Sequence, residues 1–421
     1  MSVADQAWDT RYEWRAVALL TIGFGLVGLD RFMILPLFPV MMKDLQLDYQ
    51  DLGNIAGILA VAWGVSAMFC GRLADRIGHR KVLIPATIVF SLLAGFSGLA
   101  TGVASLLVIR AAMGVSEGAF TPASIVATLE ASKPSRHGLN LGIQQNAIAL
   151  FGLGLAPIIV TQVLLIVPSW RWVFLLVCLP GFLVAYLMYR LLRDVSTAKA
   201  AQHSQTLDAA PHKWSDVFKY RNVLLNIGGM FCWLTCLMVL SALLPNYFTD
   251  YLHLSLKQMG FVMSAIGFGG SLGNLVMPGL SDRLGRKPVM IAGVIVGVLC
   301  LIALMRTGPN VTALFGLLFV IMFCVFANIT LTVGPLTVEA VPASLMTTAS
   351  GIVVGIGEVF GGGIAPALGG YVAKNFGIAN ILPLATVGMA LGLVVALALK
   401  ETAPIKQQPS RVAERAAADA R

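Results

Sequence analysis

The segment GRLADRIGHRK at residues 71–81 returns, in shorter form, as GLSDRLGRK at residues 279–287. Asp75 and Asp282 hold the same place in the two segments and are 207 residues apart, close to half of the 421-residue chain. Each segment combines glycines, which permit a tight turn, with a cluster of basic residues. Two such turns at equivalent positions indicate a chain built from two equivalent halves.

The sequence around these two segments is too apolar for a protein dissolved in water. Hydrophobic residues make up 57% of the chain and charged residues 12%, and the mean hydropathy is +0.84. Soluble proteins contain about 45–50% apolar and about 25% charged residues, and so few charges could not cover a soluble surface. This composition excludes a soluble enzyme, a disordered chain and a secreted disulfide scaffold.

Twelve apolar runs are long enough to cross a bilayer, which takes about 20 helical residues. They lie at residues 17–42, 53–71, 82–101, 105–128, 139–163, 171–192, 222–248, 258–279, 288–306, 311–338, 347–372 and 378–399. The sequence therefore predicts an all-α membrane protein with twelve transmembrane helices in two six-helix bundles.

A polar stretch near the middle of the chain divides these runs into six and six. It gives four expected units: an N-terminal bundle at 1–193, a cytoplasmic linker at 194–221, a C-terminal bundle at 222–402 and a cytoplasmic tail at 403–421. We expect a short amphipathic helix on the membrane surface at the end of the linker, over residues 214–221.

The basic residues collect on one side of this arrangement. With both termini on the same side, 22 of the 29 Lys and Arg residues flank the runs on that side, and five flank them on the other. Cytoplasmic loops carry such an excess, so we expect both termini in the cytoplasm and the protein in the cell (inner) membrane. The formal net charge of +9 belongs to these loops and does not indicate binding to nucleic acid.

The six cysteines lie in or at the ends of apolar runs and show no metal-ligand spacing. Small, buried cysteines of this kind commonly serve as packing residues. We therefore expect neither a metal nor a cofactor, and we expect the protein to be a monomer. No nucleophile–base arrangement is visible, so the sequence does not indicate an enzyme.

Five acidic or basic residues lie well inside the apolar runs, away from their ends, where a charge costs several kcal/mol. They are Asp30, Arg31, Arg110, Glu117 and Glu358. Arginine keeps its charge and offers a planar fork to a carboxylate, whereas burial disfavours the charged form of a carboxyl group. We expect arginine to bind an anion while a carboxyl group carries a proton. The alternative is ion pairs that only tie helices together, but such buried pairs stabilise poorly.

The repeated turn resembles the signature loop of the major facilitator superfamily, in both halves of the chain. The twelve-helix layout extends this resemblance over nearly the whole sequence, and it implies two bundles that rock about a central site to give alternating access. The resemblance makes the two segments gating loops, formed by Gly71, Asp75, Arg76, Gly78 and Arg80 in the first half and by Gly279, Asp282, Arg283, Gly285 and Arg286 in the second.

Asp30-Arg31, together with the later motif of Arg110, Gly114, Glu117, Phe120 and Pro122, resembles the anion:cation symporter family. That family includes bacterial hexonate and hexuronate transporters and has the vesicular glutamate transporters as relatives. The resemblance implies a proton-coupled importer of organic anions. It assigns Arg31 to the substrate, Arg110 and Glu117 to coupling, and Asp30 to a second proton site. We also expect Arg110 to contribute to the anion site.

Two residues depart from the pattern of that family. Trp63 stands where the family commonly has a tyrosine, and Glu358 lies near a position where it often has an asparagine. With Phe24, Phe32 and Phe120, Trp63 favours an aromatic or small apolar carboxylate over a sugar acid. No Lys or Arg lies within the apolar runs of its half of the chain, so we expect Glu358 to be unpaired and neutral. We therefore count it as a third proton-coupling acid, after Asp30 and Glu117.

Further polar residues in the apolar runs are candidates for contact with the substrate. They are Gln144, Gln145 and Asn328, with Asn146, Asn274, Thr330 and Thr332 as additional members. Each of these side chains could instead hold one helix to another.

The sequence thus predicts a secondary active transporter that imports a small organic anion with H⁺. Two alternatives stay open at this point. The first is an H⁺-coupled antiporter or exporter of drugs or other metabolites, for which the acidic residues would bind the substrate. The second is a sensor with a transporter fold, which would bind substrate without proton-coupled flux.

Overall fold

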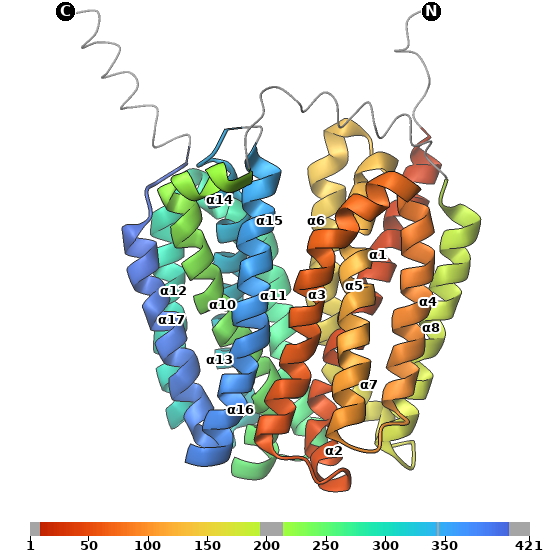
Figure 1. Cartoon of the computed structure of the whole chain (residues 1–421). Coiled ribbons are helices and arrows are strands. Elements are labelled where there is room, and N and C mark those ends of the chain that lie inside the picture. The colour runs from red at the N-terminus through yellow and green to blue at the C-terminus, as the bar shows by residue number, and fades with distance from the viewer. Residues whose placement is uncertain (1–8, 194–213, 343–344, 404–421) are drawn as a thin grey trace, which may run out of the picture.

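The computed structural model describes residues 9–193, 214–342 and 345–403, and within these ranges the chain is helical without a strand. Two helical bundles stand side by side, and α1 begins on the same side of the molecule on which α17 ends (Figure 1). We call this the terminal side and the other the opposite side. The two-bundle fold predicted from the sequence is confirmed.

The N-terminal bundle contains six spans, of which the first and fifth are interrupted. Its elements are α1 (Thr10–Phe32), η2 (Leu35–Leu37) and α2 (Phe38–Asp44), then α3 (Tyr49–Ile77), α4 (His79–Ser97), α5 (Val103–Ala131), η3 (Pro134–Arg136), α6 (His137–Ala147), η4 (Ile148–Leu155), α7 (Ala156–Val163) and α8 (Trp170–Leu191).

The C-terminal bundle repeats this plan after a short 3₁₀ segment. Its elements are η5 (Trp214–Lys219), α10 (Arg221–Asn246), η6 (Tyr247–Tyr251), α11 (Leu256–Leu284), α12 (Arg286–Arg306), α13 (Val311–Val333), α14 (Pro335–Val338), α15 (Met346–Gly357), η8 (Glu358–Ile364), α16 (Ala365–Phe376), η9 (Ile378–Asn380) and α17 (Ile381–Ala398).

Eleven of the helical segments in the described ranges are long and apolar enough to cross a membrane. The remaining long helix, α3, has 29 residues and packs along α5, so each of the twelve predicted spans corresponds to a helix.

The amphipathic helix expected at 214–221 is instead the six-residue 3₁₀ segment η5. The rest of the linker, at 194–213, and the tail from 404 lie outside the described residues, so the domain boundaries there stay predictions.

The second helix of each half shows the internal repeat in its backbone. Both α3 and α11 have 29 residues and begin with a capping box, at Asp48 and Ser255 respectively. A capping box satisfies backbone N–H groups that lack a partner in the first helical turn. Each helix ends at a glycine with positive φ, 95° at Gly78 and 103° at Gly285, which a residue with a side chain adopts only with strain.

The two predicted gating loops are therefore helix ends joined by a one-residue turn and not extended loops, and their role in gating stays a prediction. Gly71, Asp75 and Arg76 belong to α3, and Gly279, Asp282 and Arg283 belong to α11, while Arg80 and Arg286 lie in the helices that follow the turns. The physical reason is that a single glycine with positive φ reverses the chain direction, so no longer loop is needed.

Arg286 holds the second of these turns together. Its guanidinium lies 2.6 Å from the Asp282 carboxylate and 2.9 Å from that of Glu339, at the end of the tenth span. It also donates to the Ser281 hydroxyl at 2.6 Å. In the first half, Arg80 donates to the carbonyl of Tyr189 at 2.5 Å. Arg80 and Arg286 thus each connect helices within their own bundle.

The two bundles contact each other on the opposite side. Asp48, before α3, pairs with Lys374 of α16 at 2.6 Å, and the Tyr49 hydroxyl donates to Asp250 of η6 at 3.0 Å. Burial by itself raises the pKa of Asp48, but pairing with the Lys374 ammonium and hydrogen bonds from the backbone N–H groups of Asp51 and Gln50 together outweigh it, and the pKa lies below its usual value. Asp48 is therefore ionised at neutral pH.

Glycines let the backbones of the two halves approach closely at a second contact, between η4 and α11. A methyl group added at Gly267 would lie 1.9 Å from the backbone nitrogen of Gly154 and 2.4 Å from the carbonyl oxygen of Ala149. We expect Gly267→Ala to lower the stability by about 1–3 kcal/mol, as overpacking does. Thermal unfolding of the purified protein measures this loss.

The matched control for this prediction is Gly351→Ala in α15, where an added methyl group meets nothing within 4 Å. Alanine is the better helix former, so this variant should unfold at an equal or higher temperature. Equal unfolding temperatures for both variants would contradict the tight contact between the halves.

Candidate functional site

A break in the first span positions the central charged residues. The helix α1 ends at Phe32, and after two intervening residues η2 begins at Leu35, with Pro36 inside it. A helix end leaves carbonyl groups without a backbone partner, and proline supplies no N–H. The break therefore exposes acceptor oxygens in the middle of the bundle.

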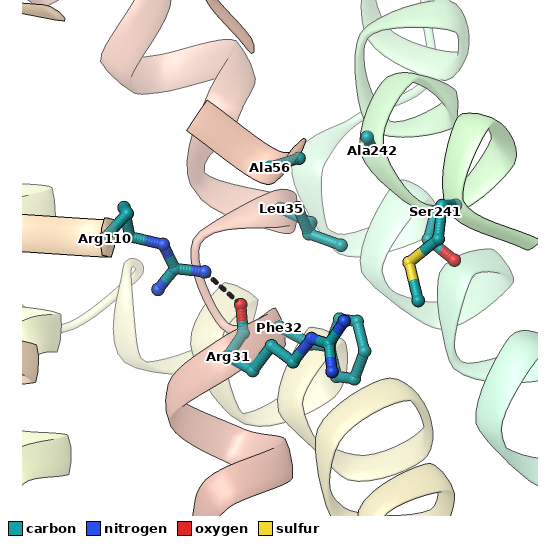
Figure 2. A pocket seen from close by; sticks show the side chains of 8 residues that line it. Arg31, Phe32, Leu35, Ala56, Arg110, Ser241 and Ala242 are labelled. Atoms are coloured by element: carbon teal, nitrogen blue, oxygen red, sulfur yellow. Dashed lines mark hydrogen bonds between the residues drawn. The ribbon is translucent and has the colours of Figure 1, made fainter. Parts of the chain in front are cut away.

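Arg110, from α5, satisfies these oxygens. Its Nη1 donates to the carbonyl of Asp30 at 3.0 Å, and its Nη2 donates to the carbonyl of Arg31. Its side chain is 1% exposed, and Figure 2 shows it reaching across to the end of α1. In this structure Arg110 is a charged cap on the broken helix.

Arg31 instead directs its side chain toward the C-terminal bundle. Its Nη2 lies 3.0 Å from Oε2 of Glu358, the first residue of η8, and the two side chains are 6% and 12% exposed. The rings of Phe32 and Trp63 have centroids 5.2 and 5.6 Å from the Arg31 Cζ atom, within range of cation–π attraction. Arg31 thus has an aromatic wall and one carboxylate partner from the other half.

This ion pair corrects the expectation that Glu358 has no arginine partner. The pair joins residues 327 positions apart, so it depends on how the halves dock and not on the composition of either. The π-helical η8 places the carboxylate over Gly362, where an added methyl group would come within 2.6 Å of Oε2. Single-turn π segments in helices often mark functional sites.

A small pocket lies between the halves beside the two arginines. The N-terminal half contributes Arg31, Phe32, Leu35, Ala56 and Arg110, and α10 contributes Met238, Ser241 and Ala242. Figure 2 shows Ser241 and Ala242 on the far wall from the arginines. The buried Ser241 hydroxyl has no hydrogen-bond partner in the described part of the chain. The pocket therefore offers positive charge, an aromatic wall and one free hydroxyl.

Two further carboxyl groups lie buried near this pocket. Asp30 is 2% exposed and Glu117 is 0% exposed. Within the described residues, both Glu117 oxygens and Oδ1 of Asp30 lack a hydrogen-bond partner. An ionised carboxylate without partners is costly to bury. These groups are therefore well suited to take up and release a proton.

The structure brings some of the predicted substrate residues together and leaves others apart. Trp63 lies beside Arg31, and its contact with substrate stays a prediction. Gln144 donates to the carbonyl of Ser124 at 3.1 Å, Gln145 is half-buried on the same helix, and Asn328 lies against Gly293 of α12. The last three do not line the pocket, and their contact with substrate stays a prediction.

Sequence reasoning missed Ser241 as a candidate. The available signal was a single hydroxyl within the apolar stretch LMVLSALLP at residues 237–245. That signal is weak, because a serine in a membrane helix can bond to its own backbone. Only the position of α10 opposite the arginines distinguishes it.

Two six-helix bundles around a central charged pocket form the architecture of a membrane transport protein. The chain belongs to the Major Facilitator Superfamily, whose family model matches residues 20–362 and 244–420. It is therefore a multi-pass membrane transporter and not an enzyme. This confirms the family resemblance seen in the repeated turns.

Individual relatives agree with this membership. The chain is 26% identical over 367 residues to a probable 4-methylmuconolactone transporter of Cupriavidus pinatubonensis, covering 86% of this chain and 84% of the relative. It is 27% identical over 352 residues to the 4-hydroxybenzoate transporter PcaK of Pseudomonas putida, covering 75% and 77%. A solved bacterial homologue of the human lysosomal transporter Spinster, inward-facing and occupied, superposes with a TM-score of 0.72 at 18% identity, covering 92% and 96%.

Proposed function

We propose that this protein imports a small organic carboxylate together with H⁺ by alternating access. The observation that carries the proposal is the pair of buried guanidinium groups, Arg31 and Arg110, at a pocket between the halves. A fixed positive charge in a low-dielectric site strongly attracts an anion and repels a cation. The names of the two transporter relatives, for 4-methylmuconolactone and 4-hydroxybenzoate, support an organic acid as substrate.

The surroundings of Arg31 favour an aromatic acid among the carboxylates. Its guanidinium can bind a carboxylate with two parallel hydrogen bonds. Phe32 and Trp63, which already flank it, would stack on an aromatic ring. Ser241 on the far wall could then bond to a polar substituent on that ring.

The orientation that we propose relates the structure to one state of the transport cycle. The excess of Lys and Arg on the terminal side supports a cytoplasmic location for that side. The described ion pair and hydrogen bond between Asp48, Lys374, Tyr49 and Asp250 lie on the opposite side. We therefore assign the structure to a state closed to the outside.

Two experiments test this function. A thermal-shift screen of organic acids should find one that stabilises the purified protein, by about 2.7 kcal/mol at 100 times its Kd. That acid should then accumulate in proteoliposomes that carry an inward proton gradient. Export of a cationic dye without acid uptake would instead establish the antiporter, and binding without flux would establish the sensor.

Coupling to protons should depend on Glu117. We expect Glu117→Gln to bind and exchange the acid but to lose accumulation driven by the pH gradient, because the amide resembles the permanently protonated carboxyl group. Counterflow and pH-driven uptake in proteoliposomes measure the two activities separately.

Glu130→Gln is the matched control, since Glu130 lies on the same helix at its terminal-side end, near His79. This control should retain pH-driven uptake. Unchanged accumulation by Glu117→Gln would transfer the coupling role to Asp30 or Glu358.

A further inference from the structure

We infer that Arg31 exchanges one carboxylate for another during transport: Glu358 occupies it in the empty carrier, and the carboxylate of the substrate replaces Glu358 once Glu358 has taken up a proton. The inference rests on the proposed function and adds a built-in competitor to the substrate site. It makes Glu358 the residue that decides when the anion can bind.

The contact itself supports this exchange. The Arg31–Glu358 distance of 3.0 Å is that of a full ion pair, and both side chains are almost completely buried. A substrate carboxylate at Arg31 would place two negative charges beside one positive charge. Two carboxylates that share one buried site do not both stay ionised. The arriving anion therefore requires Glu358 to leave or to accept a proton.

The balance of charge in the exchange is simple. Before binding, the site holds the Arg31 cation and the Glu358 anion. One proton from solution binds to a carboxylate oxygen of Glu358, its ion pair with Arg31 breaks, and the substrate carboxylate forms the new pair. The net charge at Arg31 and its partner is zero before and after. One proton thus enters the site with each carboxylate group.

Few other charged groups surround Glu358. The segment η8 packs against α3, α10, α15 and α16. The titratable or charged side chains described on these helices are Tyr49, Asp51 and Cys70 of α3, Arg221, Cys232 and Cys236 of α10, and Tyr371 and Lys374 of α16. The thiols of ordinary cysteines stay neutral below pH 8, and the charged members belong to the helix ends. In the N-terminal half, the charged or titratable residues near Arg31 are Asp30 of α1 and Arg110 and Glu117 of α5.

The exchange also explains why the pair joins the two halves. Arg31 belongs to α1 of the N-terminal bundle, and Glu358 belongs to η8 of the C-terminal bundle. While they are paired, the empty carrier has a charged link across its centre. Release of Glu358 by a proton removes that link when the substrate arrives, so that binding and movement of the halves are coupled.

Measurements of binding across a pH range test the exchange. Binding of 4-hydroxybenzoate to the purified full chain is measured from pH 5 to 8 for wild type, Glu358→Gln and the control Glu130→Gln. The affinity of the wild type and the control should fall with rising pH. Glu358→Gln should bind at pH 8 at least tenfold more tightly than wild type. The slope of its log Kd against pH should be smaller than that of wild type by one, because one fewer proton is taken up with the ligand.

A second measurement needs no ligand. Thermal unfolding of Arg31→Gln, Glu358→Gln and the double variant forms a double-mutant cycle. Each single variant leaves one buried partner unpaired, so we expect the double variant to be less destabilised than the sum of the single variants. Additive effects would show that the two groups do not interact and would overturn the inference.

The binding results separate the exchange from the proposed function. Identical pH profiles for wild type and Glu358→Gln would overturn the exchange. Absence of 4-hydroxybenzoate binding by Glu358→Gln at every pH would overturn it too, since a freed Arg31 should bind a carboxylate. In either case the proposed function survives if uptake of an organic acid still requires Arg31.

Discussion

Replacement of Arg31 by alanine should abolish carboxylate uptake. The variant removes the charge that we assign to the substrate and leaves Glu358 in a nearly dry site without its partner. Truncating one partner of a buried, hydrogen-bonded charge pair in a binding site costs about 2–5 kcal/mol, which corresponds to roughly a 30-fold to 4,000-fold loss of affinity. Binding by thermal shift and uptake in proteoliposomes measure the loss.

Two comparison variants sharpen this result. Arg31→Lys keeps the positive charge but not the planar fork, so it should retain weak binding. Arg171→Ala removes a partly exposed arginine that pairs with Asp44 on the opposite side, and such surface pairs contribute little. It should transport normally. Uptake by Arg31→Ala with the affinity of the wild type would contradict the anion site.

Replacement of Arg110 by alanine should abolish uptake and also destabilise the fold. From the sequence alone, Arg110 is a substrate or coupling residue whose loss should affect transport only. In the structure it donates to the carbonyls of Asp30 and Arg31 at the end of α1. Each hydrogen bond from a charged donor contributes about 1.5–3 kcal/mol. Yield and unfolding temperature should therefore fall together with transport.

The control for this second prediction is Arg283→Ala, because Arg283 is exposed in the second copy of the repeat. Its unfolding temperature should match that of the wild type. Arg110→Lys should be intermediate, since a single ammonium group cannot reproduce the fork that serves both carbonyls. A normal unfolding temperature for Arg110→Ala, with uptake lost, would make Arg110 a substrate ligand only.

The twelve spans and the two halves could be predicted because helix formation in a membrane is a local property. A run of about 20 apolar residues must satisfy its own backbone hydrogen bonds as a helix. The turns at Gly78 and Gly285 were visible for the same reason, since a glycine with positive φ is needed where two helices join directly. Only the length of these turns was predicted wrongly, because the sequence shows a glycine but not its backbone φ angle.

The candidate site was predictable in part. Buried charges stand out in an apolar sequence, so Asp30, Arg31, Arg110, Glu117 and Glu358 were found without a structure. Their partners were not, because a partner depends on which faces of which helices meet. Arg110 meets backbone carbonyls that become acceptors only where α1 breaks. The pattern of side chains in the sequence does not show that these backbone carbonyls lack a hydrogen-bond donor.

The sequence by itself determined the number of spans, their division into two halves and the identity of the embedded charges, since each follows from local hydropathy or from residue type. Only the tertiary structure decided that Arg31 pairs with Glu358, that Ser241 faces the arginines and that the halves are closed on the opposite side. These features join segments far apart in the chain. They depend on how two nearly rigid bundles dock, and a carrier that alternates between states has more than one such arrangement for the same sequence.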